Sequence, residues 1–136
     1  MSGLGAALVT ATEELYRQVN PNFVHGEMLT SQVFEATKKD QGLLSVTRSS
    51  KTSAKDAFER FLARKHCRSL GVVAVTVGEV NNVGLKAHDD VLPDEAAHAV
   101  IDFNEKSDGD ARRARKQLAA LAQARGWRYH PAAQLN

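Results

Sequence analysis

The side chains in this sequence that are best suited to bind a metal or act as a nucleophile are five histidines and one cysteine. Zinc sites pair their ligands at short helical or hairpin separations. No two histidines stand at such a spacing, since they occupy positions 25, 66, 88, 98 and 130. The cysteine, Cys67, lies close to Leu70 and Gly71, an apolar setting typical of a small buried side chain. The spacing therefore predicts no metal site and no cysteine nucleophile.

Loops that bind phosphate or present a nucleophile are recognised by their glycine patterns. Neither a Gly-x-Ser-x-Gly turn, which carries the serine of many hydrolases, nor a Walker-type glycine loop occurs in the chain. The sequence therefore favours a binding role over catalysis and predicts no cofactor.

Charged side chains are segregated along the chain, although the formal net charge is only +2. Residues 38–68 carry nine Lys or Arg against three acidic side chains, whereas residues 89–110 carry eight acidic side chains and one Lys. Such blocks either pair with each other and face water or form patches that steer a charged partner. The candidate partner-binding residues are Asp89, Asp90, Asp94 and Glu95 in the acidic block, and Arg112, Arg113 and Lys116 in the last predicted helix.

Nucleic-acid binding is an alternative use of that last basic cluster. Arg112 and Lys116 stand four residues apart, so they share one face of the predicted helix. However, aromatic residues make up only 6% of the chain and fall mostly in apolar runs, which leaves no stacking platform for single strands. The acidic block would also repel phosphates, so nucleic acid is the weaker alternative.

The elements that must position these residues follow from hydrophobic periodicity and from turn and cap signals. Strands are predicted over residues 13–19, 29–35, 43–47, 71–77 and 98–103, and helices over residues 53–64, 77–82 and 110–124. Residues 71–77 are apolar on both faces and rich in valine, as in a central strand covered on both sides. Ser53 is the predicted cap of the first helix, and Thr76 with Glu79 that of the second.

This order of elements predicts an α+β fold, with a single small mixed or antiparallel sheet and about two main helices packed on it, mainly on one face. Residues 1–136 are expected to form one globular domain, of which residues 1–11 could be flexible. Trp127 and Tyr129 should pack the tail onto the sheet. No apolar run approaches the ~20 residues that span a bilayer, and a lone cysteine is typical of the reducing cytoplasm, so we expect a cytoplasmic protein with no membrane partner.

A strand that reads Leu-Tyr-Arg up to Arg17, a later strand with Ser45 and a downstream Glu79 resemble the ADP-ribosyltransferases. In that family an early-strand Arg grips the dinucleotide, a strand Ser orders the site and a late Glu directs transfer. The resemblance implies an NAD-using enzyme with Arg17, Ser45 and Glu79 as catalytic residues. The Ser-Thr-Ser triplet and the paired Glu-x-Glu of the family are not present.

Four segments of the chain resemble, in the same order, a group of small uncharacterised bacterial proteins. These segments read LYRQVNP, SQVFEATKKDQGLLSV, VVAVTVGEV and HAVIDF, and they span roughly residues 14–129. The resemblance implies a single bacterial domain and implies no activity.

The sequence therefore predicts a small bacterial protein-binding module, an immunity or antitoxin-like protein or an accessory factor of a competition or defence system. A rigid surface complementary to a cognate toxin would suffice for that role, and segregated charge would speed the encounter. The alternatives are an ADP-ribosyltransferase-like enzyme using NAD and a nucleic-acid-binding protein.

Overall fold

The computed structural model describes residues 5–36, 41–64 and 67–131. Five strands build the main sheet: β1 (Glu14–Gln18), β4 (Leu43–Arg48), β5 (Val72–Thr76), β6 (Lys86–Asp89) and β7 (His98–Asp102). A short hairpin consists of β2 (Val24–His25) and β3 (Met28–Leu29). The α-helices of the described residues are α1 (Ala54–Leu62), α2 (Val77–Asn82) and α3 (Asp108–Arg125), and the 3₁₀ turns are η1 (Pro21–Phe23) and η2 (Ser31–Phe34).

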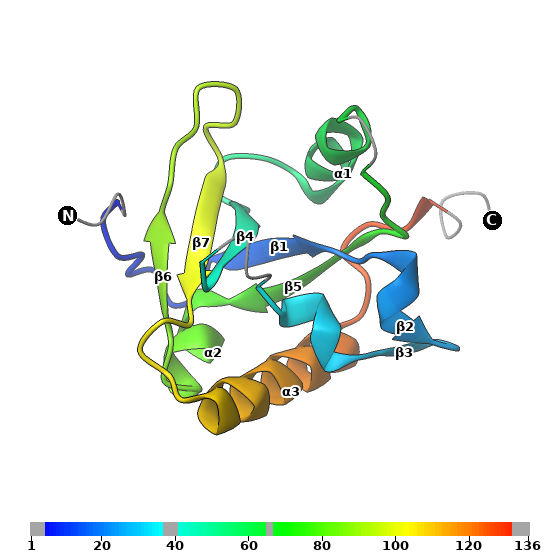
Figure 1. Cartoon of the computed structure of the whole chain (residues 1–136). Coiled ribbons are helices and arrows are strands. Elements are labelled where there is room, and N and C mark those ends of the chain that lie inside the picture. The colour runs from blue at the N-terminus through cyan, green and yellow to red at the C-terminus, as the bar shows by residue number, and fades with distance from the viewer. Residues whose placement is uncertain (1–4, 37–40, 65–66, 132–136) are drawn as a thin grey trace.

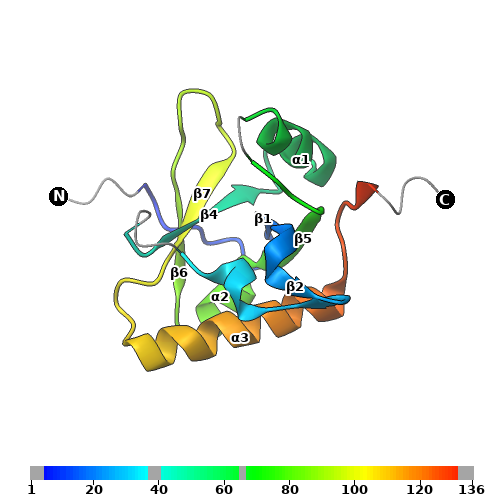
Figure 2. The same cartoon turned by 45° about the vertical axis from the view of Figure 1, so that its right-hand side comes forward.

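The main sheet has the strand order β5-β1-β4-β7-β6, and every neighbouring pair is antiparallel. Figure 1 shows α2 and α3 on one side of this sheet and α1 on the other, and the turned view in Figure 2 agrees. The predicted small α+β fold is confirmed, and its sheet is antiparallel. The expectation of helices mainly on one face is wrong for the two longer helices, because α1 and α3 lie on opposite faces.

The main hydrophobic core lies between α3 and one face of the sheet. Alternate strand residues point to this face, among them Leu15, Val75 and Ile101, which are fully buried. From α3, Leu118 and Ala122 meet them, because residues four apart share one face of a helix. Each large apolar side chain buried in this way contributes about 1.5–3 kcal/mol. This packing fixes which face of every strand points away from the core, and on β4 and β7 that outer face carries Ser45, Thr47 and His98.

The outer face is covered only in part. α1 packs Ala54 and Phe58 against Val72, with Tyr129 placed 5.1 Å from Phe58 between ring centroids. Among the strands, α1 contacts chiefly β1 and β5. α1 therefore lies over β1 and β5 on this face.

α1 and α2 begin where the sequence predicts, whereas α3 begins at Asp108, two residues before the predicted start. The Ser53 hydroxyl accepts a hydrogen bond from the Asp56 N–H at 3.1 Å at the start of α1. Thr76 and Glu79 form a reciprocal capping box at the start of α2. Such caps satisfy backbone donors that have no partner inside the helix, so they position both helices against the sheet.

The predicted strand over residues 29–35 is wrong. Only Met28–Leu29 pairs as a strand here, and Ser31–Phe34 is the 3₁₀ turn η2. Val33 and Phe34 are neighbours and both are fully buried. A strand would send successive side chains to opposite faces, whereas the turn directs both into the core beside α3.

Residues 71–77 form a covered strand, as predicted, but the expectation of a central strand is wrong. β5 is the first strand in the sheet order. Its outer edge is instead paired with the tail, since the Val72 N–H donates to the Tyr129 carbonyl and the Arg128 N–H donates to the Val72 carbonyl, both at 2.8 Å. An edge strand protected in this way is as apolar as a central one, because water reaches neither its faces nor its edge.

The sequence predicts no strand at β6, which has four residues and only Ala87 buried. A run of four residues is too short to show the alternation of apolar and polar side chains that predicts a strand. Residues 5–8 at the N-terminal end of the described chain cover the edge of β6. The Gly5 N–H donates to the Asp89 carbonyl at 3.0 Å, and the Leu8 N–H donates to the Ala87 carbonyl at 2.9 Å. Residues 5–8, part of the segment that could be flexible, are therefore hydrogen-bonded to the sheet.

Candidate functional site

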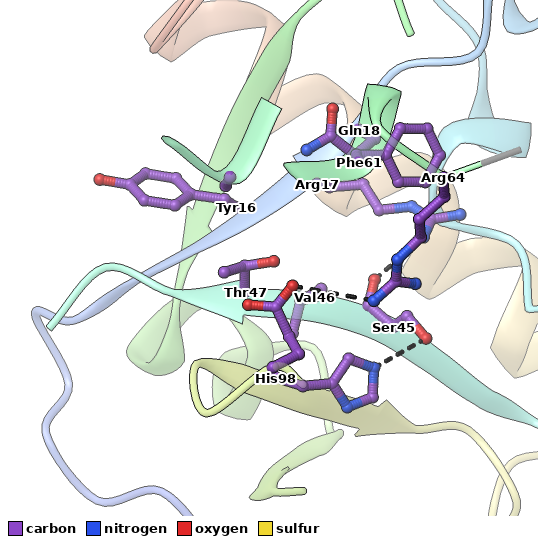
Figure 3. A pocket seen from close by; sticks show the side chains of 11 residues that line it. Tyr16, Arg17, Gln18, Ser45, Val46, Thr47, Phe61, Arg64 and His98 are labelled. Atoms are coloured by element: carbon purple, nitrogen blue, oxygen red, sulfur yellow. Dashed lines mark hydrogen bonds and ion pairs between the residues drawn. The ribbon is translucent and has the colours of Figure 1, made fainter. Parts of the chain in front are cut away.

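A polar cleft lies between α1 and the outer face of the sheet (Figure 3). It opens where β1 and β4 diverge, because these strands pair at only two residues each. Side chains from both strands, from α1 and from the start of β7 line it, including Ser45, Thr47, Phe61, Arg64 and His98. The cavity between them has a volume of about 70 Å³.

Arg17 bridges the diverging strands at the floor of the cleft. Its Nε donates to the carbonyl oxygen of Val33 at 2.7 Å, and its Nη1 donates to the carbonyl oxygen of Ser45 at 2.9 Å. These bonds tie β1 to β4 and to η2. They also hold a guanidinium charge next to Ser45.

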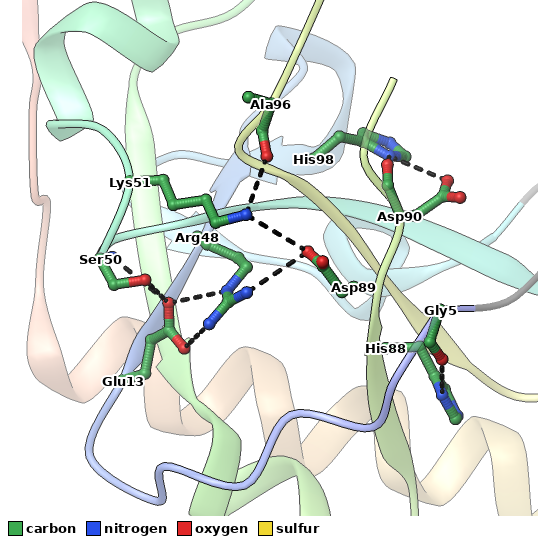
Figure 4. Close-up of polar contacts among 10 residues, drawn as sticks. All are labelled: Gly5, Glu13, Arg48, Ser50, Lys51, His88, Asp89, Asp90, Ala96 and His98. Atoms are coloured by element: carbon green, nitrogen blue, oxygen red, sulfur yellow. Dashed lines mark hydrogen bonds and ion pairs between the residues drawn. The ribbon is translucent and has the colours of Figure 1, made fainter. Parts of the chain in front are cut away.

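Ser45, His98 and Asp90 form a hydrogen-bonded relay on the outer face. The His98 Nε2 lies 3.1 Å from the Ser45 Oγ (Figure 3). The His98 Nδ1 lies 3.0 Å from the Asp90 Oδ2 and 3.0 Å from the Asp90 carbonyl oxygen (Figure 4). These are ordinary hydrogen-bond distances.

Strand register brings the relay together. Ser45 on β4 stands opposite Val100 on β7. His98 is two residues before Val100, so it is the diagonal neighbour of Ser45 on the same face of the sheet. Asp90 directly follows β6, and its N–H donates to the His98 carbonyl at 3.0 Å. The β6–β7 hairpin therefore places the carboxylate beside the imidazole.

The partners of His98 determine its neutral tautomer. Both Asp90 oxygens that face Nδ1 can only accept, so Nδ1 carries the proton. The lone pair of Nε2 then points at Ser45, whose hydroxyl must donate. A serine hydroxyl that donates to an imidazole held by a carboxylate is the arrangement that activates serine nucleophiles. Ser45 is exposed, so its oxygen is accessible to a ligand.

Two of the four acidic candidates pair with the basic block. Asp89 lies 3.3 Å from Arg48 and 3.8 Å from Lys51 (Figure 4). Glu95, which is buried, is shared by two arginines of the α1 region; they are Arg60 at 3.1 Å and Arg64 at 3.8 Å. Part of the segregated charge is thus neutralised inside the molecule.

The other two acidic candidates differ from each other. Asp90 belongs to the relay with His98. Asp94 is exposed, and the structure gives it no ion pair with any described residue. Within the acidic set, Asp94 is therefore the residue most available to a partner.

Glu13 and Arg48 form a largely buried ion pair at the end of β4 (Figure 4). The Arg48 Nε and Nη2 donate to the two carboxylate oxygens of Glu13, each at 3.0 Å, and the Ser50 hydroxyl donates to the same carboxylate at 2.5 Å. Burial by itself would raise the pKa of Glu13, but the hydrogen bonds from Arg48 and Ser50 outweigh it and lower that pKa. This pair anchors the end of β4 next to Asp89.

The structure brings Arg17 and Ser45 together in one cleft but places Glu79 elsewhere. Glu79 belongs to α2, which Figure 1 shows on the opposite side of the sheet from α1. Arg125 donates to both of its carboxylate oxygens, at 2.9 and 2.8 Å, and these bonds lower the pKa of Glu79 against the effect of burial. Glu79 also accepts from the Thr76 N–H at 2.8 Å. Its contacts are those of a capping residue.

The basic candidates Arg112, Arg113 and Lys116 are exposed on α3. The Arg113 Nη1 lies 3.6 Å from the Asp110 carboxylate, one turn earlier in the helix. These side chains lie on the surface of α3, which packs on the opposite side of the sheet from α1 (Figure 1). They take no part in the cleft.

Sequence reasoning leaves His98 out of every candidate set and assigns Asp90 only to partner binding. Alternation along residues 43–47 does place Ser45 on the polar face, and His98 begins an apolar strand. Their contact depends on the β4–β7 register, which those patterns do not determine. Two polar side chains on outward strand positions are the available signal.

No family model matches the chain, and neither a curated protein nor a solved structure matches it. Within the described ranges, no group of three or more His, Cys, Asp or Glu side chains is placed to hold a metal ion. No helix in that part of the chain is both long and apolar enough to cross a bilayer. The cleft is the main source of functional information in the molecule.

Proposed function

We propose that the protein is a hydrolase that uses Ser45 as a nucleophile to cleave a carboxylic ester. The observation that carries this proposal is the 3.1 Å contact between the Ser45 Oγ and the His98 Nε2, with Asp90 on the other ring nitrogen. The relay supplies a nucleophile, a general base and a group that orients the base. No cofactor is needed for this chemistry.

The reaction proceeds in two steps, acylation of Ser45 and hydrolysis of the acyl-serine. The Ser45 Oγ attacks the ester carbonyl carbon while the His98 Nε2 takes the hydroxyl proton. The bond to the leaving alcohol then breaks, and His98 returns the proton to that alcohol. Water then attacks the acyl-serine while the His98 Nε2 takes a proton from it. The bond to the Ser45 oxygen breaks, His98 returns that proton to this oxygen, and the carboxylic acid is released. The net change is hydrolysis of an ester by one water molecule.

Arg17 has an electrostatic role in this scheme. It is fixed beside Ser45 by its bond to the Ser45 carbonyl oxygen. A fixed positive charge near the reacting carbon stabilises the oxyanion that develops in each step. The site therefore combines an activated serine with a preorganised charge.

The test is hydrolysis of 4-nitrophenyl acetate, together with mass spectrometry after treatment with a fluorophosphonate. We expect turnover, and a covalent adduct on Ser45. Ser45→Ala should abolish both signals. Ser31→Ala serves as the matched control, because Ser31 lies in η2 outside the cleft. An unlabelled Ser45 in a folded protein without turnover would refute the proposal.

Our second proposal is a protein-binding role, in which the chain acts in the bacterial cytoplasm as an immunity or antitoxin-like partner of a toxin, or as an accessory factor. Its support is the connection between β6 and β7, which projects beyond the sheet (Figure 1). Val91 on this connection is 55% exposed, and Asp94 is exposed as well. An exposed apolar side chain near an acidic one suits a partner with a basic, partly apolar surface.

This second role is tested by measuring the association rate between this protein and the protein encoded by the gene next to its own. Asp94→Lys should slow association, most strongly at low salt, because opposite charges steer the encounter. Glu59→Lys makes the same charge change at an exposed position on α1 and should have a smaller effect. Equal effects of the two variants, or no association at all, would remove the support for this role.

A further inference from the structure

The rim of the cleft carries more positive than negative charge. Arg60 and Arg64 share one carboxylate, that of Glu95. The carboxylate is nearly buried, with a side-chain exposure of 10%, whereas the arginine side chains are 54% and 47% exposed. Two guanidinium groups against one carboxylate leave one positive charge at the open end of the site.

Arg64 is the member of this group that faces the site. It lines the cleft, whereas Arg60 does not, and Figure 3 shows its side chain directed towards Ser45. Its Nη2 stands 3.8 Å from Glu95, beyond hydrogen-bond distance, while Arg60 takes the closer 3.1 Å contact. The planar guanidinium of Arg64 can therefore bind a carboxylate or phosphate through two parallel N–H donors.

The cavity limits the group that is transferred to Ser45. Its volume of about 70 Å³ is well below the roughly 300–1,000 Å³ of pockets that hold drug-sized ligands. Phe61, Val46 and Ala57 contribute apolar walls. This small space favours a short acyl chain over a long one.

We infer that the substrate is a short-chain ester, such as an acetyl ester, whose leaving alcohol carries an anionic group that Arg64 binds. This inference rests on the proposed hydrolase and adds its substrate class. The acyl group occupies the small cavity beside Ser45, and the anion, a carboxylate or a phosphate, lies at the open rim. Binding energy from a remote anion helps to place the ester carbonyl at the nucleophile.

The experiment compares matched acetyl esters as probes. 4-Acetoxybenzoate and 4-acetoxyphenyl phosphate carry the anion, and 4-acetoxybenzamide is their neutral counterpart. We expect kcat/KM for an anionic ester to exceed that for the amide by about tenfold or more, as for a charged hydrogen-bonded contact. The arm that is faster, carboxylate or phosphate, identifies the anion. The hexanoyl ester of 4-hydroxybenzoate should react at least tenfold more slowly than the acetyl ester.

Two arginine variants locate the effect. Arg64→Gln should lower kcat/KM for the anionic ester to the level of the amide. Arg60→Gln also removes one positive charge beside Glu95, but Arg60 does not line the cleft. This variant should therefore still hydrolyse the anionic ester faster than the amide. Equal hydrolysis of charged and neutral esters with a labelled Ser45 would overturn the substrate class while the hydrolase stands. No hydrolysis of any ester and no label on Ser45 would overturn both.

Discussion

Single residues on the outer face of the sheet act through the atoms that they present. Asp90 directs two oxygens to one nitrogen of His98, and Ser45 directs its hydroxyl to the other. All three stand on the face that does not contact α3. Replacing one of them alters the path of a proton without opening the main hydrophobic core.

The first prediction concerns Asp90→Asn. An amide can donate to the His98 Nδ1, which would favour the wrong tautomer and leave Nε2 protonated. We expect kcat for 4-nitrophenyl acetate to fall about 10²–10⁴-fold, while the melting temperature stays close to that of the parent. Circular dichroism and steady-state kinetics provide the two measurements. A variant that keeps full activity would show that Asp90 does not position the base.

The second prediction concerns the buried pair of Glu13 and Arg48. Arg48→Leu leaves the Glu13 carboxylate buried, with a side-chain exposure of 4%, and without its charge partner. Such a change costs about 3–5 kcal/mol, measured by urea unfolding at neutral pH. The double variant Glu13→Gln with Arg48→Met should recover much of this loss, because no unpaired charge remains.

The third prediction concerns the pH dependence of the same pair. Because the folded state lowers the pKa of Glu13 below its ordinary value of 4.5, ionised Glu13 contributes stability above that value. The contribution is lost as the pH falls through the folded pKa. Unfolding free energies measured between pH 7 and pH 3 should therefore decline more steeply for the parent than for Glu13→Gln. Parallel curves for the two proteins would contradict this assignment.

Elements of the fold owe their burial to neighbours that are distant in the chain. β5 lies at the edge of the sheet, yet Val72, Ala74 and Val75 are fully buried. β1 pairs with one side, the tail pairs with the other, and α1 and α3 contribute to the two faces. The apolar composition of this strand thus reflects complete coverage and says nothing about its position in the sheet.

The fourth prediction is that Ala74→Asp destabilises the protein by more than about 3 kcal/mol or prevents soluble folding, because it buries a carboxylate without a partner. Ala120→Asp is the matched control, since Ala120 is exposed on α3, and it should cost less than about 1 kcal/mol. Urea unfolding measures both. A cooperative transition of Ala74→Asp with a midpoint near that of the parent would contradict the observed burial.

The molecule as a whole uses part of its segregated charge internally. Asp89 and Glu95 meet arginines of the basic block, so the acidic and basic stretches of the sequence hold the hairpin connection near α1 and the end of β4. Arg112, Arg113 and Lys116 remain exposed on α3, on the other side of the sheet from the cleft. Their charges face solvent, whereas the charge of Arg64 faces the candidate site.

The fifth prediction follows from that exposure. Replacing Arg112, Arg113 and Lys116 together with Gln should change the free energy of unfolding by less than about 1 kcal/mol per residue. Binding to duplex or single-stranded oligonucleotides should be weak before and after, measured by fluorescence anisotropy at low salt. Tight binding by the parent, with a steep salt dependence that the triple variant loses, would instead support nucleic-acid recognition.

Local patterns in the sequence predict several elements correctly. The caps at Ser53 and at Thr76 with Glu79 depend on residues three apart, and the strand beginning at His98 depends on a continuous apolar run. These signals act over a few residues, so they survive any change in how the elements pack. The 3₁₀ turn at Ser31–Phe34 and the four-residue β6 are missed because burial against distant segments determines both.

The sequence by itself determined a small α+β fold and its main helices. Only the tertiary structure decided that His98 stands diagonal to Ser45, that Asp90 holds the far side of the imidazole, and that Glu79 lies away from Arg17. The physical reason is that strand order and register arise from packing across the whole sheet. A one-residue shift in the β4–β7 register would move every side chain of one strand to the opposite face, and the alternating pattern of either strand alone does not specify its partner.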